Sequence, residues 1–219
     1  MKSYKLVIFD MDGTILYTLD DIVDGLNDAL QKSSLPHIDK ENVRKFIGRG
    51  IRHEVENSVP QGTSSEVIEQ VFRDFNTYYA VHCADHTGPY DGILDLMKKL
   101  KEMKILCAVV SNKGDYAVQE LDQQYFPGLL DAGVGEKKGI RRKPAPDTVN
   151  AVLDQLQVKK EDAVYIGDTE VDIETAVNAE MDAIIVEWGY RDHDFLVEHG
   201  ARTLVKSVKE LEEILVSQK

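Results

Sequence analysis

The sequence predicts an α/β fold in which a doubly wound parallel sheet carries an inserted all-α domain. Three observations support this prediction. Short runs of consecutive apolar residues alternate with amphipathic stretches, three of these runs are followed directly by a polar or acidic residue, and the segment 15–85 shows only helical patterns. Parallel strands that helices cover on both faces are continuously apolar, whereas half-exposed strands alternate between apolar and polar residues.

The predicted sheet contains four strongly apolar strands and two weaker ones. The strong strands are residues 6–9, 105–110, 163–166 and 183–186, and the weaker ones are residues 129–134 and 203–205. Helical stripes around Leu96 and Val152 precede the second and third strong strands, and residues 169–179 and 208–216 are further helices. Strand–helix–strand alternation favours right-handed crossovers, so the core is expected to be Rossmann-like.

The segment 15–85 interrupts this alternation. Two apolar stripes at helical spacing run through it, one containing Ile22 and Leu26 and the other containing Val71 and Phe75. A connection of this length is too long for a simple crossover. We therefore predict a core domain of residues 1–14 and 86–219 and a helical cap domain of residues 15–85, with the turn at 88–92 marking the return to the core.

Composition excludes several classes of function. Lys plus Arg number 26 and Asp plus Glu number 39, which gives a formal net charge of −13. A general nucleic-acid binder and an anionic-membrane binder both need a basic face, so neither is expected. Cys83 and Cys107 are the only cysteines, and the apolar run near the N-terminus is too short for a signal peptide. These features predict a cytoplasmic protein in a reducing compartment.

Carboxylates follow two of the predicted strands. Asp10 and Asp12 come after the first strand, and Asp168 and Asp172 come after the strand at 163–166. Ligands of parallel sheets bind outside the carboxyl ends of strands, which is where these residues fall. A solvated turn explains the first pair about equally well, and helix capping explains one member of the second pair. Capping does not explain two carboxylates one helical turn apart.

Two further segments could bind an anion. Ser111 and Asn112 end the strand at 105–110, where a hydroxyl group and free amides suit a phosphate, although a helix N-cap is the simpler interpretation when this motif is taken alone. Lys143 ends a basic run that Pro144 and Pro146 stiffen. Such a run is usually a solvated surface, but on an acidic chain it could attract an anionic substrate.

Bringing the four aspartates together requires a cation. Two unit charges 4 Å apart repel by about 4 kcal/mol at a surface-like dielectric. A hard divalent ion with oxygen ligands removes this repulsion, and the lack of His or Cys in these motifs argues against zinc. Mg²⁺ is favoured because it binds through a few carboxylates together with substrate phosphate and water.

These motifs, in this order, resemble those of the haloacid dehalogenase superfamily of phosphohydrolases. The resemblance implies that Asp10 is a nucleophile that forms an aspartyl-phosphate and that Asp12 is the general acid/base. It further implies that the Asp10 carboxylate, the Asp12 main-chain carbonyl and Asp168 hold Mg²⁺, with Asp172 beside the ion. Residues implied to bind the phosphoryl group or the substrate are Thr14, Ser111, Asn112 and Lys143.

The resemblance also implies that the inserted helices form a cap and that the substrate is a small phosphorylated metabolite. The chain is most similar to the phosphoglycolate phosphatase-like branch, so phosphoglycolate is the first expected substrate. Arg49, in the turn at 46–50 between two cap helices, is a candidate substrate contact, or else an exposed arginine at a helix end. An aspartate at position 12 argues against the dehalogenase and phosphonatase branches. A sugar phosphomutase, or a pyrophosphatase or nucleotidase specificity, is the alternative, and the chain is expected to be a monomer or homodimer.

Overall fold

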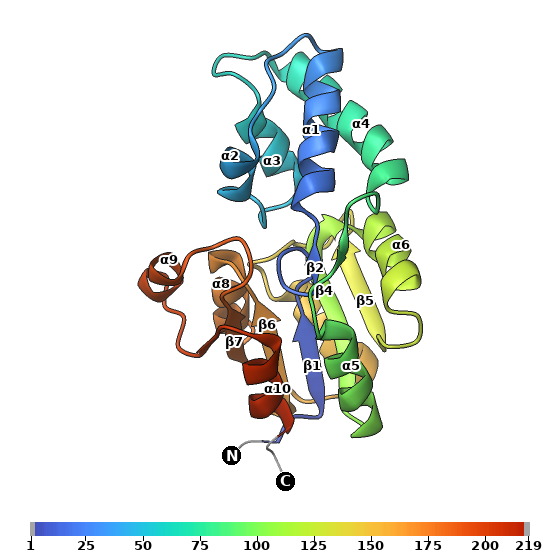
Figure 1. The fold of residues 1–219 in the computed structure, drawn as a ribbon, viewed down its shortest axis with the longest axis vertical. Coiled ribbons are helices and arrows are strands. Elements are labelled where there is room, and N and C mark those ends of the chain that lie inside the picture. Colours follow the sequence, from blue (N-terminus) through green and yellow to red (C-terminus); the bar gives the residue numbers. More distant parts are fainter. Residues whose placement is uncertain (1–2, 217–219) are drawn as a thin grey trace.

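The computed structural model describes residues 3–216 and contains a six-stranded sheet in which all neighbouring strands are parallel (Figure 1). The strand order is β5-β4-β1-β6-β7-β8, so the first strand of the chain lies in the middle of the sheet. Sheets of this kind bind ligands at the carboxyl ends of strands where the winding direction reverses, which here is beside β1. The strands are β1 (Leu6–Phe9), β4 (Leu106–Gly114), β5 (Ala132–Glu136), β6 (Ala163–Gly167), β7 (Asp182–Val186) and β8 (Leu204–Val205).

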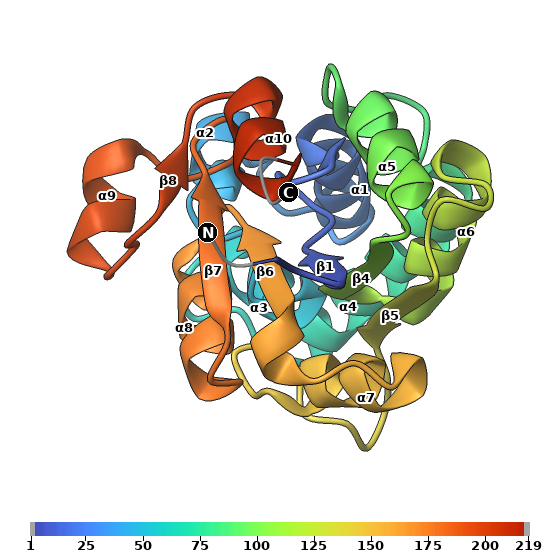
Figure 2. The ribbon, with the colours of Figure 1, turned by 90° about the horizontal axis from the view of Figure 1, so that it is seen from below.

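Helices cover both faces of the sheet (Figure 2). Successive residues of β1 point to opposite faces, so Val7 and Phe9 belong to one apolar core and Leu6 and Ile8 belong to the other. Burial on both faces explains why this strand is apolar at every position. The first core is covered by α5 (Ile93–Glu102), α6 (Asp115–Tyr125) and α10 (Val208–Val216), and the second by α7 (Asp147–Leu156) and α8 (Glu170–Asn178). The short helix α9 (His193–Glu198) lies beyond β8, and a 3₁₀ turn, Lys160–Asp162, precedes β6.

The predicted strands agree with the structure to within a few residues, and the doubly wound α/β core is confirmed. The largest differences are in two strands. The strand expected at 105–110 continues to Gly114, and the strand expected at 129–134 begins only at Ala132. Leu129 and Leu130 lie in the preceding turn, where they pack against the core without pairing in the sheet. Their apolar character therefore reflects burial rather than strand geometry.

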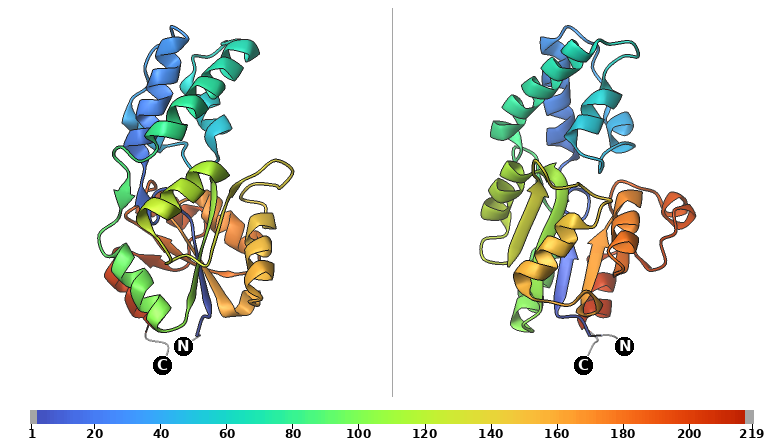
Figure 3. Two further views of the ribbon diagram at one scale, coloured as in Figure 1. Left: turned by 90° about the vertical axis from the view of Figure 1, so that its right-hand side faces the viewer. Right: turned by 180° about the vertical axis from the view of Figure 1, so that it is seen from behind.

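Four helices stand beyond the carboxyl ends of the central strands (Figures 1 and 3). Leu26 and Leu30 of the first helix and Val71 and Phe75 of the fourth are buried where these two long helices pack together. Gly25 permits this close packing, because a Cβ at its position would lie 3.0 Å from the Phe75 ring. The helices are α1 (Leu19–Lys32), α2 (Lys40–Arg44), α3 (Ile51–Ser58) and α4 (Ser65–His82).

A two-stranded antiparallel ribbon connects these helices to the sheet. It pairs β2 (Leu16–Tyr17) with β3 (Gly88–Pro89). The expectation that residues 15–85 contain no strand is therefore wrong at its first residues. Two paired residues are too short to produce a periodic signal in the sequence, and the pairing exists only because the chain passes this point twice.

The carboxylate of Asp21, near the start of α1, fixes the returning chain beside this ribbon. It is buried and accepts hydrogen bonds from the backbone amide of His86 at 2.9 and 3.1 Å and from that of Thr87 at 2.9 Å. Each amide would otherwise lack a partner in the protein interior, which is costly. Asp21 therefore joins the outgoing and returning segments at a single point.

Within residues 3–216, no helix is both long enough and apolar enough to cross a bilayer. The longest helix, α4, runs from Ser65 to His82 and carries charged residues on its exposed face.

We expect Asp21→Ala to lower the free energy of unfolding by about 1 to 3 kcal/mol, because the buried Thr87 amide and the partly buried His86 amide lose a charged acceptor. Asp24→Ala is the matched control, since its side chain is half exposed on the same helix, and a change below about 0.5 kcal/mol is expected there. Urea unfolding of the three proteins measures the difference. Equal destabilisation by the two variants would contradict the anchoring role of Asp21.

Candidate active site

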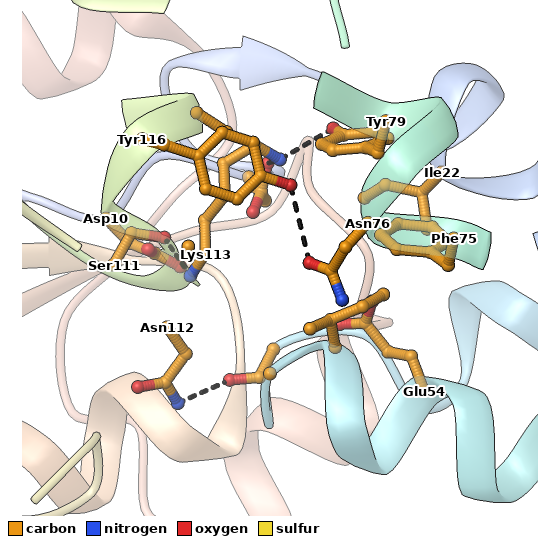
Figure 4. A pocket seen from close by; sticks show the side chains of 16 residues that line it. Asp10, Ile22, Glu54, Phe75, Asn76, Tyr79, Ser111, Asn112, Lys113 and Tyr116 are labelled. Atoms are coloured by element: carbon orange, nitrogen blue, oxygen red, sulfur yellow. Dashed lines mark hydrogen bonds and ion pairs between the residues drawn. The ribbon is translucent and has the colours of Figure 1, made fainter. Parts of the chain in front are cut away.

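Asp10 leaves the end of β1 and lies at the floor of a pocket between the sheet and the four helices (Figure 4). Its side chain is buried, and its Oδ1 accepts a hydrogen bond of 2.7 Å from the backbone amide of Met11. The same oxygen lies 2.8 Å from Nζ of Lys143. The carboxylate is therefore fixed in direction both by its own loop and by a lysine that lies far away in the sequence.

Lys143 is buried and contacts three polar groups, from the loop after β1, from β6 and from α8. Its Nζ lies 2.8 Å from Asp10, 2.9 Å from Oδ1 of Asp172, and 3.0 Å from the hydroxyl oxygen of Tyr165. An ammonium group has three protons to donate, and each has a partner here. This lysine was predicted from the sequence as a phosphate ligand, and the structure places it against the carboxylates.

Asp172, which was predicted to lie beside a metal ion, caps a helix and holds Lys143. Its Oδ2 accepts hydrogen bonds from the backbone amides of Asp168 and Thr169, at 3.2 and 3.0 Å, and from the Thr169 hydroxyl at 2.7 Å, which forms a capping box at the start of α8. Its Oδ1 faces Lys143 and accepts from the hydroxyl of Tyr165 at 3.1 Å. Capping by one oxygen thus leaves the other free to hold Lys143.

Asp168 is held by groups from two other loops. Its Oδ1 accepts from the hydroxyl of Thr14 at 2.9 Å, and its Oδ2 accepts from the backbone amide of Tyr190 at 2.7 Å. Gly13 and Gly189 allow these loops to approach, because a Cβ at either position would lie within 2.4 Å of the Asp168 side chain. Thr14 was expected to contact the substrate; its side chain is buried, and it is not among the described residues that line the pocket.

The buried carboxylates repel one another. Asp10, Asp168 and Asp172 each place an oxygen within 4.8 Å of the others, with one lysine among them. Burial, reinforced by Asp172 and Asp12 and opposed by Lys143, raises the pKa of Asp10 to about 7. Burial and the charges of Asp172 and Asp10 raise the pKa of Asp168 well above its ordinary value. Burial acts on Asp172 in the same direction, but Lys143 and Thr169 outweigh it and hold its pKa below normal.

This donor set fits a hard divalent cation. Three carboxylates that share one ammonium group leave an excess of negative charge in a buried place, and this excess raises the pKa of Asp168. Carboxylate oxygens are the ligands that Mg²⁺ and similar ions prefer, and no His or Cys belongs to the cluster within residues 3–216. The Asp12 side chain lies outside this group, so its predicted contribution to metal binding rests on its main-chain carbonyl.

The motif after β4 connects several parts of the site. Ser111 is buried beside Asp10 in the pocket, and its Oγ accepts from the Lys113 amide at 3.3 Å. The side-chain amide of Asn112 donates to the carbonyls of Gly48 and Lys143, at 2.9 and 3.0 Å, and accepts from the Lys143 amide at 2.8 Å. Asn112 therefore fixes the backbone of Lys143 and at the same time contacts the loop between α2 and α3.

Lys113 is a site residue that the sequence analysis did not select. Its Nζ lies 2.8 Å from Oδ1 of Asp12 and 2.7 Å from the hydroxyl oxygen of Tyr79 on α4 (Figure 4). The pKa of Tyr79 is well above its usual range because of burial and the nearby Asp12 charge, so this hydroxyl stays protonated. One signal was available: Lys113 follows Ser111 by two residues, which is the repeat of a strand face.

Arg49 lies in the predicted turn between α2 and α3 and points toward the core. Its guanidinium is 3.2 Å from Oε1 of Glu170, whose other oxygen accepts from Nε of Arg191 at 2.9 Å. Arg191 also donates to the carbonyls of Arg44 and Ile47, both at 2.8 Å. Arg49 is thus part of a contact between the helices and the core, and it is not among the described residues that line the pocket.

The pocket above Asp10 is partly open to solvent. Its far side is formed by α1, α3, α4 and the start of α6, and it includes Glu54, a buried carboxyl group from α3. Burial, with a contribution from Asp12, raises the pKa of Glu54 to about 7. No sequence signal marked this residue, because a glutamate in a polar helix normally faces solvent.

The comparison with protein-family models gives one decisive match. The model described as "Haloacid dehalogenase-like hydrolase" matches residues 7–186. The chain belongs to this family. The matched range contains Asp10, Ser111, Lys143, Asp168 and Asp172, so the strand ends that converge in the structure all lie within it. The resemblance expected from the four ordered motifs is confirmed.

Relatives within the haloacid dehalogenase-like family include phosphatases. A phosphoglycolate phosphatase of Aquifex aeolicus is 32% identical over 187 residues, which cover 85% of this chain and 86% of the relative. An N-acetylmuramic acid 6-phosphate phosphatase of Pseudomonas aeruginosa is 28% identical, with 96% and 94% covered. A crystal structure from Lactobacillus delbrueckii subsp. bulgaricus has 42% identity and a TM-score of 0.92, with 98% and 99% covered. The protein is therefore an enzyme of the haloacid dehalogenase-like hydrolase family, and its relatives include phosphatases.

We expect Mg²⁺ to raise the melting temperature by about 5 to 10 °C at a concentration 100-fold above its Kd. The Asp168 pKa is higher in the folded protein than the unfolded value near 4, so ionisation of Asp168 costs stability as the pH rises from about 4 through the folded pKa. Mg²⁺ offsets this cost, and its effect should be larger at pH 8 than at pH 5.

Thermal melts with and without Mg²⁺ at the two pH values measure this dependence. Asp168→Asn should remove most of the shift, whereas Asp194→Asn, at an exposed position on α9, should keep it. A shift of the same size in both variants would contradict a metal site at Asp168.

Proposed function

We propose that the protein is a Mg²⁺-dependent phosphatase that hydrolyses a small phosphorylated metabolite through an aspartyl-phosphate on Asp10. The observation that carries the proposal is the position of Asp10. Its carboxylate lies at the floor of the pocket, 2.8 Å from Lys143, beside two further aspartates that could hold a cation. A buried carboxylate facing an open pocket, with positive charge beside it, suits attack on a phosphoryl group.

Two groups keep Asp10 competent as a nucleophile. Burial favours its protonated form, with a pKa of about 7, while the ammonium of Lys143 favours the ionised form that attack requires. The Lys143 pKa stays well above normal, because Asp10 and Asp172 outweigh the desolvation that would lower it. Lys143 therefore remains a cation and can also neutralise charge on the transferring phosphoryl group, with Ser111 and Asn112 next to it.

Asp12 is proposed as the general acid/base. Protonated, it gives its proton to the alkoxide oxygen of the leaving alcohol as the bond from phosphorus to that oxygen breaks. As a carboxylate, it takes a proton from the water that attacks the aspartyl-phosphate and releases inorganic phosphate. Lys113, 2.8 Å from Asp12, would orient this side chain.

A bound Mg²⁺ would neutralise charge on the phosphoryl oxygens during both steps. We propose that the carboxylates of Asp10 and Asp168 and the main-chain carbonyl of Asp12 hold it, with Asp172 beside it. The proximity of the three carboxylates supports this assignment. The hydroxyl of Thr14 orients Asp168, since it donates to the same carboxylate.

We further propose that residues 15–85 act as a cap over a core of residues 1–14 and 86–219. The contacts of Asn112 with Gly48, of Lys113 with Tyr79 and of Arg191 with Ile47 join the helices to the sheet around the pocket. Closure of this kind excludes water other than the attacking molecule. Arg49 would contribute through its ion pair with Glu170.

The names of the relatives support a small phosphomonoester as substrate. Phosphoglycolate is the first compound to test, because several curated relatives are named for it. The identity of 32% to the Aquifex aeolicus enzyme supports the reaction class more strongly than the exact substrate. Phosphate release from a panel of small phosphoesters in the presence of Mg²⁺ tests the proposal, and a panel without any release would refute it.

Asp10→Asn is expected to lower turnover by at least about 1,000-fold, because the amide is a poor nucleophile of nearly the same shape. Acid quench of the wild-type reaction followed by peptide mass spectrometry should locate an acyl-phosphate on Asp10, and the variant should lack it. Circular dichroism checks that the variant is folded. Wild-type turnover in the variant would remove Asp10 as the nucleophile.

Lys113→Met is expected to lower kcat by about tenfold or more and to change KM less, because Asp12 loses the cation that orients it. Tyr79→Phe is the comparison variant: it removes the hydroxyl that Lys113 contacts but leaves the pair with Asp12 in place, so a smaller loss is expected. The pH dependence of kcat should shift only in Lys113→Met. If KM alone changed in that variant, Lys113 would be a substrate contact rather than a positioning residue.

A further inference from the structure

The pocket has two chemically different ends (Figure 4). Asp10 and Ser111 form one end, where the proposed reaction places the phosphoryl group. The other end faces the helices and must receive the alcohol to which the phosphate is attached. The side chains that helices α1, α3 and α4 contribute to the lining are Ile22, Ile51, Glu54, Phe75, Asn76 and Tyr79.

Glu54 is the one acidic side chain that the helices contribute to the lining. It lies in the first turn of α3 with only 6% of its surface exposed, on the opposite side of the pocket from Asp10 (Figure 4). The backbone amide of Gly48 donates a hydrogen bond to its carboxyl group. Among the described residues, no lysine, arginine or histidine forms an ion pair with it.

The cations nearest to this end are already paired elsewhere. Lys113 lines the pocket, but its ammonium lies 2.8 Å from Asp12 and 2.7 Å from the Tyr79 hydroxyl. Arg49 pairs with Glu170. The charge of Lys113 also acts on Glu54, but Asp12 shares this one cation, so two acidic side chains face one ammonium group in this part of the pocket.

The contact with the Gly48 amide is structural, but it does not account for the place of this carboxyl group in the pocket lining. Burial raises its pKa to about 7, which means that the ionised side chain is less favourable in the folded protein than in water. Val55, the next residue, is fully buried, so this part of α3 already has an apolar anchor. The position of the carboxyl group in the pocket lining points instead to a ligand.

We propose that Glu54 determines specificity, selecting phosphate esters of uncharged, hydroxyl-bearing alcohols, such as polyol or sugar phosphates, and rejecting esters whose alcohol carries a carboxylate. The proposal rests on the phosphatase function proposed above and narrows its substrate class. It also departs from phosphoglycolate as the substrate, since glycolate carries a carboxylate.

The chemistry of the surrounding side chains fits this class. A carboxylate accepts hydrogen bonds only, so Glu54 suits hydroxyl groups that donate. Asn76 already has one amide proton on the Phe72 carbonyl at 2.7 Å, and its Oδ1 faces the Tyr116 hydroxyl at 3.5 Å. Ile22 and Phe75 offer apolar contact to the carbon skeleton. A second carboxylate brought to this end would add to the charges of Glu54 and Asp12, which already share the ammonium group of Lys113, and this disfavours it.

Two matched pairs of substrates test the proposal. The first pair is glycerol 3-phosphate and 3-phosphoglycerate, and the second is glucitol 6-phosphate and 6-phosphogluconate. In each pair the first compound has a terminal hydroxymethyl group where the second has a carboxylate. In the wild-type enzyme with Mg²⁺ at pH 8, we expect kcat/KM to favour the uncharged member of at least one pair by about tenfold or more. The ratio within a pair cancels any common effect on the chemistry at Asp10.

Glu54→Gln keeps the shape of the side chain and removes its charge, so the preference should fall at least about fivefold. Glu56→Gln removes the same charge from an exposed position of α3 and should leave the ratio unchanged. Thermal melts check that both variants fold. A wild-type preference for the carboxylate-bearing esters, or an unchanged ratio in Glu54→Gln, would overturn the role of Glu54 while leaving the phosphatase function intact. Failure to release phosphate from every ester, including p-nitrophenyl phosphate, would overturn both proposals.

Discussion

The ammonium group of Lys143 is the positive charge around which the acidic end of the sheet is assembled. Asp10 and Asp172 contact it directly, and Asp168 lies within 4.8 Å of both carboxylates. Three buried carboxylates without a cation would repel one another strongly. The remaining features of the site act to keep this lysine in place: the Asn112 side chain binds its backbone on both sides, and Tyr165 accepts its third proton.

Two side chains of the site also contact the inserted helical segment. Asn112 reaches both Lys143 and the carbonyl of Gly48, so one side-chain amide contacts a residue of the core and a residue of the inserted segment. Lys113 makes a similar connection between Asp12 and Tyr79. Displacement of the helices would break contacts made by the residues that orient Lys143 and Asp12. The geometry of the site and the position of the helices are therefore interdependent.

The sequence was sufficient to predict the aspartates but not every contact around them. Asp10 and Asp168 end strands that are apolar at each position, and that pattern alone places them at one edge of the sheet. The ribbon at Leu16 has no such pattern, since two residues cannot show a period. Glu54 and Lys113 were missed for a different reason. Their roles depend on how the helices sit over the sheet, and the two-residue spacing from Ser111 to Lys113 does not reveal that tertiary arrangement.

The β2–β3 ribbon has a consequence for how such a protein can diversify. The chain leaves and re-enters the core through two adjacent strands, so everything between Tyr17 and Gly88 is attached at a single place. Asp10, Lys143 and Asp168 all come from outside this segment. The inserted helices can therefore change in sequence, or be exchanged, without disturbing the register of the sheet. Such changes are compatible with the site only where the contacts of Asn112 with Gly48 and of Lys113 with Tyr79 are kept, because these side chains also contact Lys143 and Asp12.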